Sequence, residues 1–331
     1  MNIGFCYDLL DDNILNSDDP KDKYYEWDEP KLIAYISSAI IKNGYELTDI
    51  GNFDNLFKNV DNFKQNIDIV FNLCEGLEGR NRESEVPLLL EKTKIPYIGS
   101  DALSMGLTLD KVLSKKIFYS ENILTPKYFW VTEQLEFIGD TNLKYPLFVK
   151  LRWEGSSKGI DEGSVIKSKN ELKERIDILI NKYQEPVIVE EFISGREFTV
   201  PVIGNGNDAE ACSVNEIIYN NSEDKLKDYF SSRQVFDFQN VKYTAQPDLS
   251  EILINEIREI ALTVHRSMEI KDFSRIDMRM DSKEKIFVLE INPLPSLSDE
   301  DHFGVMRKFK GWSYEQMIGN IINAGRKRYG I

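Results

Sequence analysis

Four polar side chains suited to metal and phosphate chemistry occur in two strand-like runs near the C-terminus. The runs are FSRIDMRM and KIFVLEIN, and they meet around the segment DSKEK. A hairpin turn centred in that segment would set Asp277 opposite Glu290 and Arg275 opposite Asn292. Because successive side chains of a strand alternate between its faces, Arg275 and Asp277 share one face, as do Glu290 and Asn292. The register therefore predicts that all four gather on one face of a hairpin.

This set of side chains suits a divalent cation. Two carboxylates and an amide oxygen are hard ligands, which Mg²⁺ (or Mn²⁺) accepts when phosphate oxygens and water complete its coordination shell. Arg275 would stabilise negative charge that develops on an oxygen. The alternative is an Asp–Arg ion pair on an exposed sheet face, which predicts no metal dependence, although opposed acids destabilise a sheet unless a cation lies between them. Apolar cover for the hairpin comes from Phe273, Ile276, Phe287, Leu289 and Ile291.

A lysine ends an apolar strand-like run in the segment LFVKLRWEGSSKGI. Lys150 is costly in such a place unless an anion meets it, and a nucleotide phosphate would serve. A loop then follows whose backbone N–H groups and hydroxyls can approach phosphate closely, and it contains Gly155, Ser156, Ser157 and Gly159. The loop lacks Walker A spacing, and an ordinary hairpin turn is the alternative interpretation. Lys111, in TLDKVLSKK, is a second candidate cation, with a surface lysine as its alternative.

The segment VIVEEFISGREFTV supplies a third element. A strand ends in Glu190 and Glu191, turns at Gly195, and resumes with Glu197 inside an apolar run. Backbone groups at a strand end can pair with an adenine edge, and a carboxylate can hold ribose hydroxyls. An edge strand with solvated acids is the alternative, and it competes more strongly for Glu191 than for Glu197.

The first hundred residues alternate strand and helix candidates. NIGFCYDLL, YELTDIG, IDIVFNL and IPYIGS read as strands, while PKLIAYISSAIIKNG and SEVPLLLEKTK have helical spacing. This rhythm predicts a parallel sheet with helices on its faces. An acidic segment, residues 11–29, interrupts it after the first strand, and we interpret it as a solvated loop or part of a lid.

The remainder reads as α+β. Two helical pieces in SMGLTLDKVLSKKIFYSENI precede an extended run, TPKYFWV, and the strand of Lys150. A helix near 168–183 and the strand PVIVEEFI follow. The last third contains the strand EFTVPVIGN, a polar stretch at about 205–245, the helix LSEILINEIREIALTVHRSM and the hairpin.

Composition limits the classes of partner. The 331 residues suffice for about two domains. Lys and Arg number 41 against 56 Asp and Glu, which gives a net charge of −15 and argues against nucleic acid or membrane as the main partner. No apolar run approaches membrane-spanning length, and MNIGFCYDLL lacks the basic start of a signal peptide.

The cysteines and histidines predict no chemistry of their own. Cys6, Cys74 and Cys212 are widely spaced and odd in number, as expected of reduced core cysteines in a cytosolic protein. His265 and His302 lie far from other soft ligands, so we expect them to be structural or exposed.

Taken in order, these segments resemble the ATP-grasp ligases, and most of all the D-alanine–D-alanine ligases. TLDKVLSKK, LFVKLRWEGSSKGI, VIVEEFISGREFTV, FSRIDMRM and FVLEINPLPSLS carry the resemblance, and IPYIGSDALSMGLTLDK is similar to the family's join between its first two domains. It covers roughly residues 67–325. The resemblance implies an ATP-grasp fold with an N-terminal parallel-sheet (pre-ATP-grasp) domain. The implied domains are 1–100, 101–192 and 193–331, with ATP between the second and third.

The resemblance also implies an activity and a role for each candidate residue. Such enzymes use ATP and Mg²⁺ to phosphorylate a carboxylate, and the amine of a second substrate attacks the acyl phosphate. Phosphates would be held by Lys111 and Lys150 and covered by the loop of Ser157. Adenosine would be bound by Glu190, the backbone at Glu191 and Ile193, and Glu197. Two Mg²⁺ ions would be bound by Asp277, Glu290 and Asn292. Arg275 would steady the tetrahedral intermediate, and Ser156 would help to place the substrates.

By the same resemblance the substrates would be amino acids or peptides, and the chain would act in the cytoplasm, in cell-wall biosynthesis. A homodimer follows by analogy alone. A kinase on the same fold, or a binding protein without turnover, are the alternatives. A binding protein without turnover is disfavoured, because the chain has the complete set of Arg275, Asp277, Glu290 and Asn292.

The departures concern the amino-acid pockets. The family opens with a glycine-rich loop and a glutamate that binds the first D-alanine; here Glu26 or Glu29 would stand in. The Lys–Tyr pair of the family's active-site loop is not evident, and Tyr229 or Arg233 would substitute. The family's serine for the second carboxylate is replaced by an acid, Asp301, which would repel a carboxylate. NLCEGLEGRNRESE departs from the usual His-Gly loop. We therefore expect an intact ATP site with altered amino-acid pockets.

Overall fold

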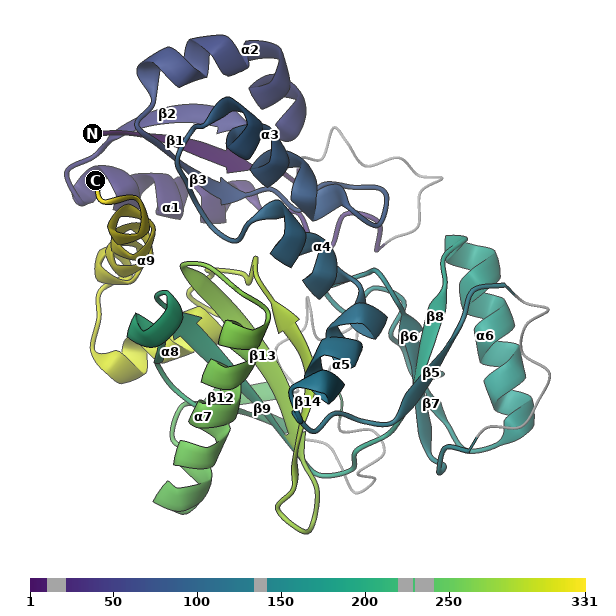
Figure 1. Ribbon diagram of the computed structural model, residues 1–331. Helices are drawn as coiled ribbons and strands as arrows, with labels where there is room; N and C mark the ends of the chain where they lie inside the picture. Colours follow the sequence, from purple (N-terminus) through teal and green to yellow (C-terminus); the bar gives the residue numbers. More distant parts are fainter. Residues whose placement is uncertain (11–21, 134–141, 220–228, 230–240) are drawn as a thin grey trace.

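The computed structural model describes residues 1–10, 22–133, 142–219, 229 and 241–331. Arg233 and the first part of the acidic segment lie outside the described residues. The described chain forms three sheets with helices packed against them (Figure 1). Their strands fall in turn within 1–100, 101–192 and 193–331. The predicted order, a parallel α/β unit followed by α+β units, is confirmed.

The first sheet is parallel throughout and has the order β2-β1-β3-β4. Its strands are β1 (Asn2–Tyr7), β2 (Glu46–Gly51), β3 (Ile69–Leu73) and β4 (Tyr97–Ile98), and its helices are α1 (Pro30–Lys42), α2 (Phe53–Asn66) and α3 (Glu85–Thr93). Alternation along β1 sends Ile3 and Phe5 to the face covered by α1, and Cys6 to the face covered by α2 and α3. Helix α2 and the 3₁₀ turn Arg82–Ser84 are elements of this unit that the sequence patterns did not predict.

The second sheet is antiparallel, with the order β5-β8-β6-β7. It contains β5 (Tyr128–Val131), β6 (Leu147–Leu151), β7 (Val165–Ile166) and β8 (Val187–Glu191), and α6 (Lys169–Tyr183) packs on one face. The side chain of Ser168 caps α6 by accepting a hydrogen bond from the backbone N–H of Glu171. The stretch between β6 and β7 is the Gly/Ser loop, so its position depends on this sheet.

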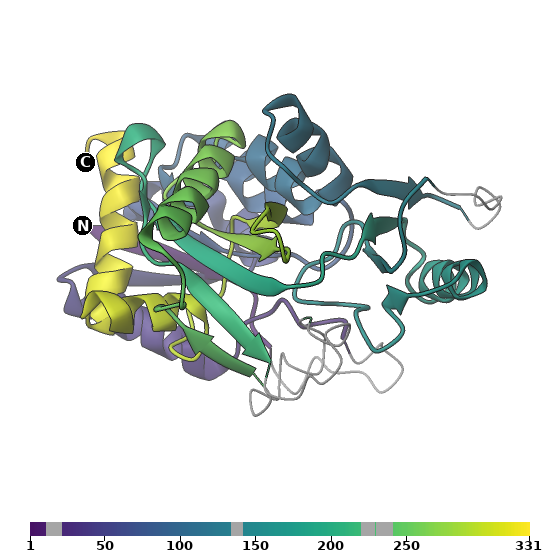
Figure 2. The same ribbon diagram turned by 90° about the horizontal axis from the view of Figure 1, so that it is seen from below.

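The third sheet has the order β12-β11-β9-β13-β14, with β10 beside β9. It contains β9 (Arg196–Ile203), β10 (Glu210–Ala211), β11 (Asn215–Tyr219), β12 (Val241–Thr244), β13 (Phe273–Met280) and β14 (Ile286–Asn292). Helices α7 (Glu251–Ser267), α4 (Ala102–Leu109) and α5 (Lys111–Ser120) pack beside it (Figures 1 and 2). Phe118 of α5 lies in the core of this sheet, although its number falls in the range predicted for the central domain.

The C-terminus returns to the first sheet. After α8 (His302–Lys310), α9 (Tyr314–Tyr329) lies against α1 (Figure 1). Met317, Ile318 and Ile321 are fully buried there in one core with Ile3 and Phe273. Each such side chain stabilises the fold by roughly 1.5–3 kcal/mol. This shared core joins the first sheet to the third.

A buried aspartate reinforces that junction. Asp272 is fully buried and accepts hydrogen bonds from the backbone N–H of Gly99 at 2.9 Å and from Arg328 of α9 at 2.7 Å. It also accepts one from the side chain of Asn205 at 2.9 Å. One carboxylate therefore connects the end of the first sheet, the third sheet and the last helix.

The cysteines lie in the core, as predicted. Cys6, Cys74 and Cys212 are free and buried, and burial raises the pKa of the Cys212 thiol to about 12. His265 is buried between the hydroxyl of Ser274, 2.8 Å away, and the carbonyl of Gly204, and burial lowers its pKa to about 4. It is structural, as expected. Among the described residues, no helix is long and apolar enough to cross a bilayer.

Candidate active site

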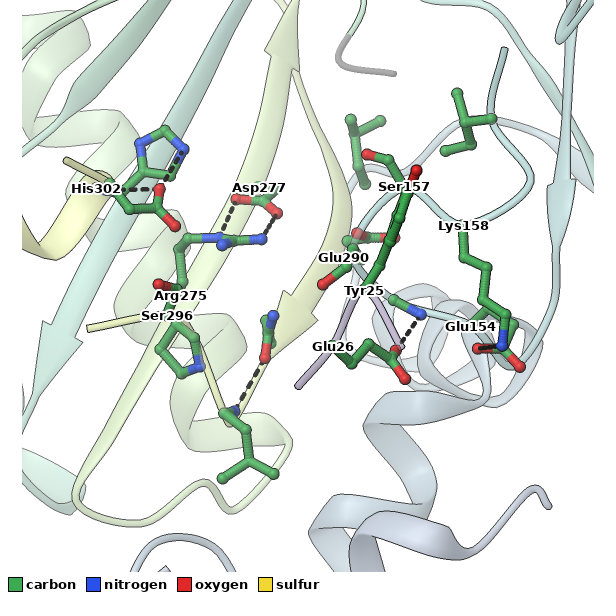
Figure 3. A pocket seen from close by; sticks show the side chains of 18 of the residues that line it. Tyr25, Glu26, Glu154, Ser157, Lys158, Arg275, Asp277, Glu290, Ser296 and His302 are labelled. Atoms are coloured by element: carbon green, nitrogen blue, oxygen red, sulfur yellow. Dashed lines mark hydrogen bonds and ion pairs between the residues drawn. The ribbon is translucent and has the colours of Figure 1, made fainter. Parts of the chain in front are cut away.

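A cavity of about 390 Å³ lies where the three sheets approach one another, and all of the predicted site residues line it. The list is Lys111, Lys150, Ser156, Ser157, Glu190, Glu191, Ile193, Glu197, Arg275, Asp277, Glu290 and Asn292. They come from helix α5, from the second sheet and the segments after β6 and β8, and from strands β9, β13 and β14 of the third sheet. Side chains from the acidic N-terminal segment close the opposite wall, where Tyr25 and Glu26 face the Gly/Ser loop (Figure 3).

The hairpin has the predicted register. Arg275 pairs with Asn292 and Asp277 with Glu290, and a shift in register follows between Asp277 and Met278. Arg275 donates two hydrogen bonds to the carboxylate of Asp277, at 3.0 and 2.9 Å. The ion pair that the alternative interpretation invoked is therefore present. It lies on the cavity wall and not on an exposed face, since the two side chains are 19% and 18% exposed.

Lysines surround Glu290. Lys150 lies 3.2 Å and Lys111 3.8 Å from its carboxylate. Burial opposes ionisation of Glu290, but these two cations hold its pKa well below the usual range. Lys111 is 7% exposed and donates a hydrogen bond to the carbonyl of Glu154, so the surface-lysine interpretation is wrong.

The carboxylate of Glu190 is paired with two lysines. Its carboxylate lies 2.9 Å from Lys115 and 3.6 Å from Lys150. Lys115 is completely buried and donates to the hydroxyl of Thr125 at 2.7 Å and to the carbonyl of Leu289 at 3.1 Å. The sequence analysis missed Lys115. Its spacing of four from Lys111 puts both lysines on one helix face, which is the signal that could have found it.

The Gly/Ser loop has an unusual backbone. Ser156, Ser157 and Gly159 have φ angles of 43°, 56° and 70°, in the left-handed region. A Cβ atom on Gly155 would lie 2.6 Å from the Glu26 carboxylate, so that side chain would have to shift to admit it. The backbone N–H of Gly155 donates to that carboxylate at 2.7 Å. The loop joins two antiparallel strands, as the hairpin-turn interpretation held, and it also forms one wall of the cavity.

At the strand end proposed to bind adenine, some hydrogen-bonding groups already have partners within the protein. The backbone N–H of Glu191 donates to the carbonyl of Lys127 at 2.9 Å, so that group is not available to a ligand. The Glu191 side chain accepts from the backbone of Lys144. Glu197 accepts from the hydroxyl of Tyr219 at 2.8 Å and pairs with Arg279 at 3.2 Å. Burial raises the pKa of Glu197 despite Arg279.

Both candidates for the N-terminal glutamate, Glu26 and Glu29, line the cavity. Glu26 faces the cavity, and Arg82 donates to both of its oxygens, at 2.9 and 2.8 Å. Glu29 is exposed at the N-terminus of α1, at the cavity's edge. The sequence analysis did not anticipate Arg82, which is buried in a short 3₁₀ turn before α3.

Tyr229 and Asp301, which we expected to replace residues of the family's pattern, also line the cavity. Tyr229 is buried, contacts the rings of Phe148 and Phe192, and donates to the carbonyl of Asp161 at 2.7 Å. Asp301 caps α8, beside the buried ring of His302. His302 lines the cavity, so it is not exposed, and burial lowers its pKa.

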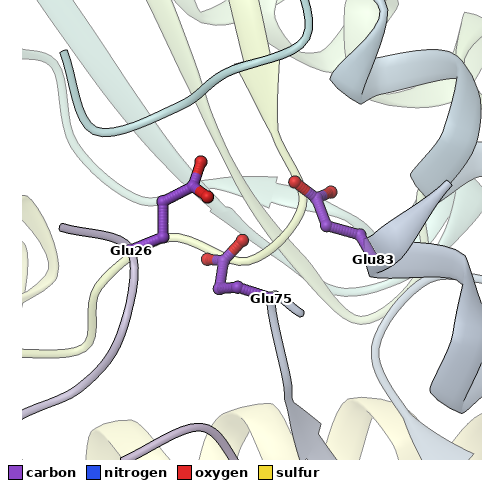
Figure 4. Close-up of side chains that lie close together, drawn as sticks. All are labelled: Glu26, Glu75 and Glu83. Atoms are coloured by element: carbon purple, nitrogen blue, oxygen red, sulfur yellow. The ribbon is translucent and has the colours of Figure 1, made fainter. Parts of the chain in front are cut away.

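The loop that departs from the family's pattern contributes an acidic cluster. Carboxylate oxygens of Glu26, Glu75 and Glu83 lie within 4.8 Å of one another, and their side chains converge in Figure 4. Burial raises the pKa of Glu83 to about 8, although Arg82 opposes this shift. Burial also raises the pKa of Glu75. The cluster joins this loop to the N-terminal segment that contains Glu26, and no single motif predicts it.

Comparisons with known proteins agree with this architecture. A family model described as the D-ala D-ala ligase C-terminus matches residues 123–323. The D-alanine–D-alanine ligase of Aquifex aeolicus is 34% identical, over 75% of this chain and 80% of its own. That of Pelagibacter ubique is 30% identical, over 93% of this chain and 96% of its own. The solved structure of the Bacillus anthracis D-alanine–D-alanine ligase complexed with ATP covers 99% of this chain and 98% of its own, with a TM-score of 0.73 at 21% identity. The predicted ATP-grasp fold is confirmed.

Proposed function

The chain belongs to the D-alanine–D-alanine ligase family of ATP-dependent ligases, and on that premise we propose that it joins the carboxylate of one amino acid to the amine of another through an acyl phosphate. The observation that carries the proposal is the cavity at the meeting point of the three sheets. Residues chosen from the family's motifs and from the hairpin register, far apart in sequence, all line it.

The nucleotide would lie between the second and third sheets. Lys150 and Lys111 would hold its phosphates, and the Gly/Ser loop would cover them. The φ angles of Ser156 and Ser157 support this role, because left-handed residues turn neighbouring backbone N–H groups toward one side of a loop. Glu191 and Ile193, at the end of β8, and Glu197 would contact adenosine. Glu190 would act indirectly in that case, by fixing Lys150 and Lys115.

The hairpin residues fit a divalent cation. Asp277, Glu290 and Asn292 offer two carboxylates and one amide oxygen on adjacent strands, the donor set that Mg²⁺ or Mn²⁺ accepts. When bound, the metal ion would neutralise charge on the phosphates. Arg275, held by Asp277 at 2.9 Å, would be oriented toward the reacting oxygen.

The chemistry would proceed in two balanced steps. A carboxylate oxygen of the first substrate attacks the γ-phosphorus of ATP, the bond to the ADP oxygen breaks, and an acyl phosphate forms. The amine nitrogen of the second substrate then attacks the acyl carbon, inorganic phosphate leaves, and the nitrogen loses a proton. Arg275 would stabilise the oxyanion of the tetrahedral intermediate, and Ser156 would help to align the substrates.

The residues expected to bind the amino acids favour substrates other than a pair of D-alanines. Asp301 disfavours a carboxylate where the family places a serine, and Arg82 already donates hydrogen bonds to both carboxylate oxygens of Glu26. We place the reaction in the cytoplasm, and in cell-wall biosynthesis, by analogy with the relatives, and a homodimer by the same analogy.

The test is a screen for ADP formation with Mg²⁺, ATP and D- or L-amino acids, offered singly and in pairs. A ligase releases ADP in quantity only when both an acid and an amine are present, and mass spectrometry of the product identifies the new bond. ADP release with an acid alone, at the same rate, would instead indicate a kinase on this fold. An absence of ADP with every combination would refute the proposal.

A further inference from the structure

The wall of the cavity opposite the hairpin contains more carboxylates than cations. Glu75 and Glu83 come from one loop and Glu26 from the N-terminal segment, yet their oxygens lie within 4.8 Å of one another. Glu26 and Glu75 line the cavity, and Glu83 lies close to them in the 3₁₀ turn Arg82–Ser84 before α3 (Figure 4). Arg82 is the cation that pairs with this group directly, through Glu26. A site that concentrates acids in this way needs a counter-charge.

Glu83 points to a ligand independently of that clustering. Its side chain is 5% exposed, and within the described residues its Oε2 atom has no hydrogen-bond partner. A buried carboxylate oxygen without a donor is costly. One oxygen of Glu83 lies within 4.8 Å of an oxygen of each of the other two carboxylates, so a donor that arrived among them would contact all three at once.

Glu26 has little capacity left for such a donor. Its Oε1 atom accepts from Arg82 at 2.9 Å and from the backbone N–H of Gly155 at 2.7 Å, and its Oε2 atom accepts from Arg82 at 2.8 Å. Arg82 is fixed in turn by the carbonyl of Trp153 at 2.9 Å and by Glu154 at 3.2 Å. The free acceptors of the wall therefore belong to Glu75 and Glu83.

The contacts of Arg82 favour an ammonium group over a metal ion at this cluster. A nitrogen that donates three tetrahedral hydrogen bonds of about 2.8 Å holds its acceptors about 4.6 Å apart, which fits within the 4.8 Å limit on these oxygens. Mg²⁺, which draws neighbouring ligands to about 3 Å from one another, fits within the same limit, so the choice depends on charge. A divalent cation would be repelled by the Arg82 guanidinium, which contacts both oxygens of Glu26.

We infer that Glu75 and Glu83, supported by Glu26, bind a primary ammonium group of a substrate, and that the enzyme prefers a diamino acid to a neutral amino acid of the same length. This rests on the proposed function. A neutral zwitterion brings no net charge to the wall, whereas a diamino acid brings one positive charge to a surplus of acids. Asp28, on the same wall, adds to that surplus.

The experiment compares ornithine with 2-aminopentanoate, which is the same chain without the terminal amine. Each enantiomer is titrated by calorimetry into the protein with Mg²⁺ and a non-hydrolysable ATP analogue. Ornithine should bind at least about tenfold more tightly, and Glu83→Gln and Glu75→Gln should each remove most of that preference. Glu85→Gln is the matched control, because it removes the same charge from an exposed position two residues away and should keep the preference.

Three results would overturn the inference. They are equal affinity of the wild type for the two ligands, a preference that survives both substitutions, and a Mn²⁺ site in the nucleotide-free protein that Glu83→Gln abolishes. Circular dichroism on each variant verifies that it is folded. Failure of this inference leaves ADP release with neutral amino acids intact, whereas failure of the proposed function leaves no amino-acid-dependent ADP release at all.

Discussion

Replacement of Lys115 by methionine should both destabilise the fold and weaken nucleotide binding. Lys115 is completely buried, and its ammonium lies 2.9 Å from the Glu190 carboxylate. Methionine fills much of the same volume but carries neither the charge nor the donors to Thr125 and Leu289. The substitution therefore leaves a buried carboxylate with a single, more distant cation.

The magnitude follows from that geometry. Removal of one partner of a buried ion pair costs about 3–5 kcal/mol, because the other charge stays buried without compensation. Lys150 lies 3.6 Å from Glu190 and can take up part of the loss, so we expect about 3 kcal/mol, the lower end of that range. Lys150 would then be drawn away from Glu290 and from the proposed phosphate position, which lowers the affinity for ATP.

Urea denaturation measures the first effect and calorimetry with an ATP analogue the second. Lys116→Met is the matched control, since Lys116 is the exposed neighbour on the same helix and should change stability by less than about 1 kcal/mol. The double variant Lys115→Met/Glu190→Leu removes both charges and should recover most of the lost stability. A loss below about 1 kcal/mol for Lys115→Met, or a double variant no more stable than the single one, would refute the reasoning.

Three further predictions use the same cavity. Asp277→Asn or Glu290→Gln should abolish ATP turnover and should lower the urea midpoint, because each carboxylate is also paired with a cation of the cavity; normal turnover at saturating Mg²⁺ would reject the metal site. Lys150→Ala should raise the KM for ATP about 10- to 100-fold, because a charge-assisted contact contributes about 1.5–3 kcal/mol, and unaltered affinity by calorimetry would count against the phosphate role. Burial raises the pKa of Glu83 to about 8, above its unfolded value, so the stability it contributes is lost as the pH rises toward 8. Between pH 6.5 and 8 the thermal midpoint should therefore fall, and Glu83→Gln should flatten that slope; His265, with a pKa of about 4, stays neutral in this window. An equal slope in both proteins would contradict this assignment.

The hairpin was predictable because local rules determine it. A five-residue turn sets the register of its strands, and alternation then decides which side chains share a face. Asp277 pairs with Glu290 as expected. The shift in register comes after that pair, so it does not alter the four residues that matter.

Other elements give weak local signals. Helix α2 contains FDNLFKNVDNFKQN, and of its side chains only Leu56 and Phe63 are buried. Its apolar face is narrow, and it contains many asparagines, which favour turns and helix caps over helix interiors. Its sequence therefore does not differ clearly from that of a loop. Strands β11 and β12 lie in a polar stretch and depend on pairing with β9 and with each other. The sequence analysis missed both strands because non-local pairing forms them.

The acidic cluster shows the limit of motif reasoning. The loop NLCEGLEGRNRESE departs visibly from the family's pattern, yet nothing in its own spacing says that Glu75 and Glu83 meet Glu26. Arg82 connects this loop to Glu26 in the N-terminal segment and to Glu154 in the loop after β6. Only the packing of the units brings the three carboxylates together.

The charges of the cavity divide it into two ends, and this division relates the acidic chain to its anionic cosubstrate. At the hairpin end cations and acids are matched: Lys150 and Lys111 with Glu290, and Arg279 with Glu197. A triphosphate that arrived there without a metal ion would find these cations already paired, so its charge would be poorly compensated. Divalent ions on the hairpin carboxylates would reverse this balance by converting acids into a positive surface. The opposite wall keeps its carboxyl groups, whose raised pKa values a bound cation would lower. If the nucleotide binds as proposed, it would be confined to one end, and a cationic group of a substrate would be drawn to the other.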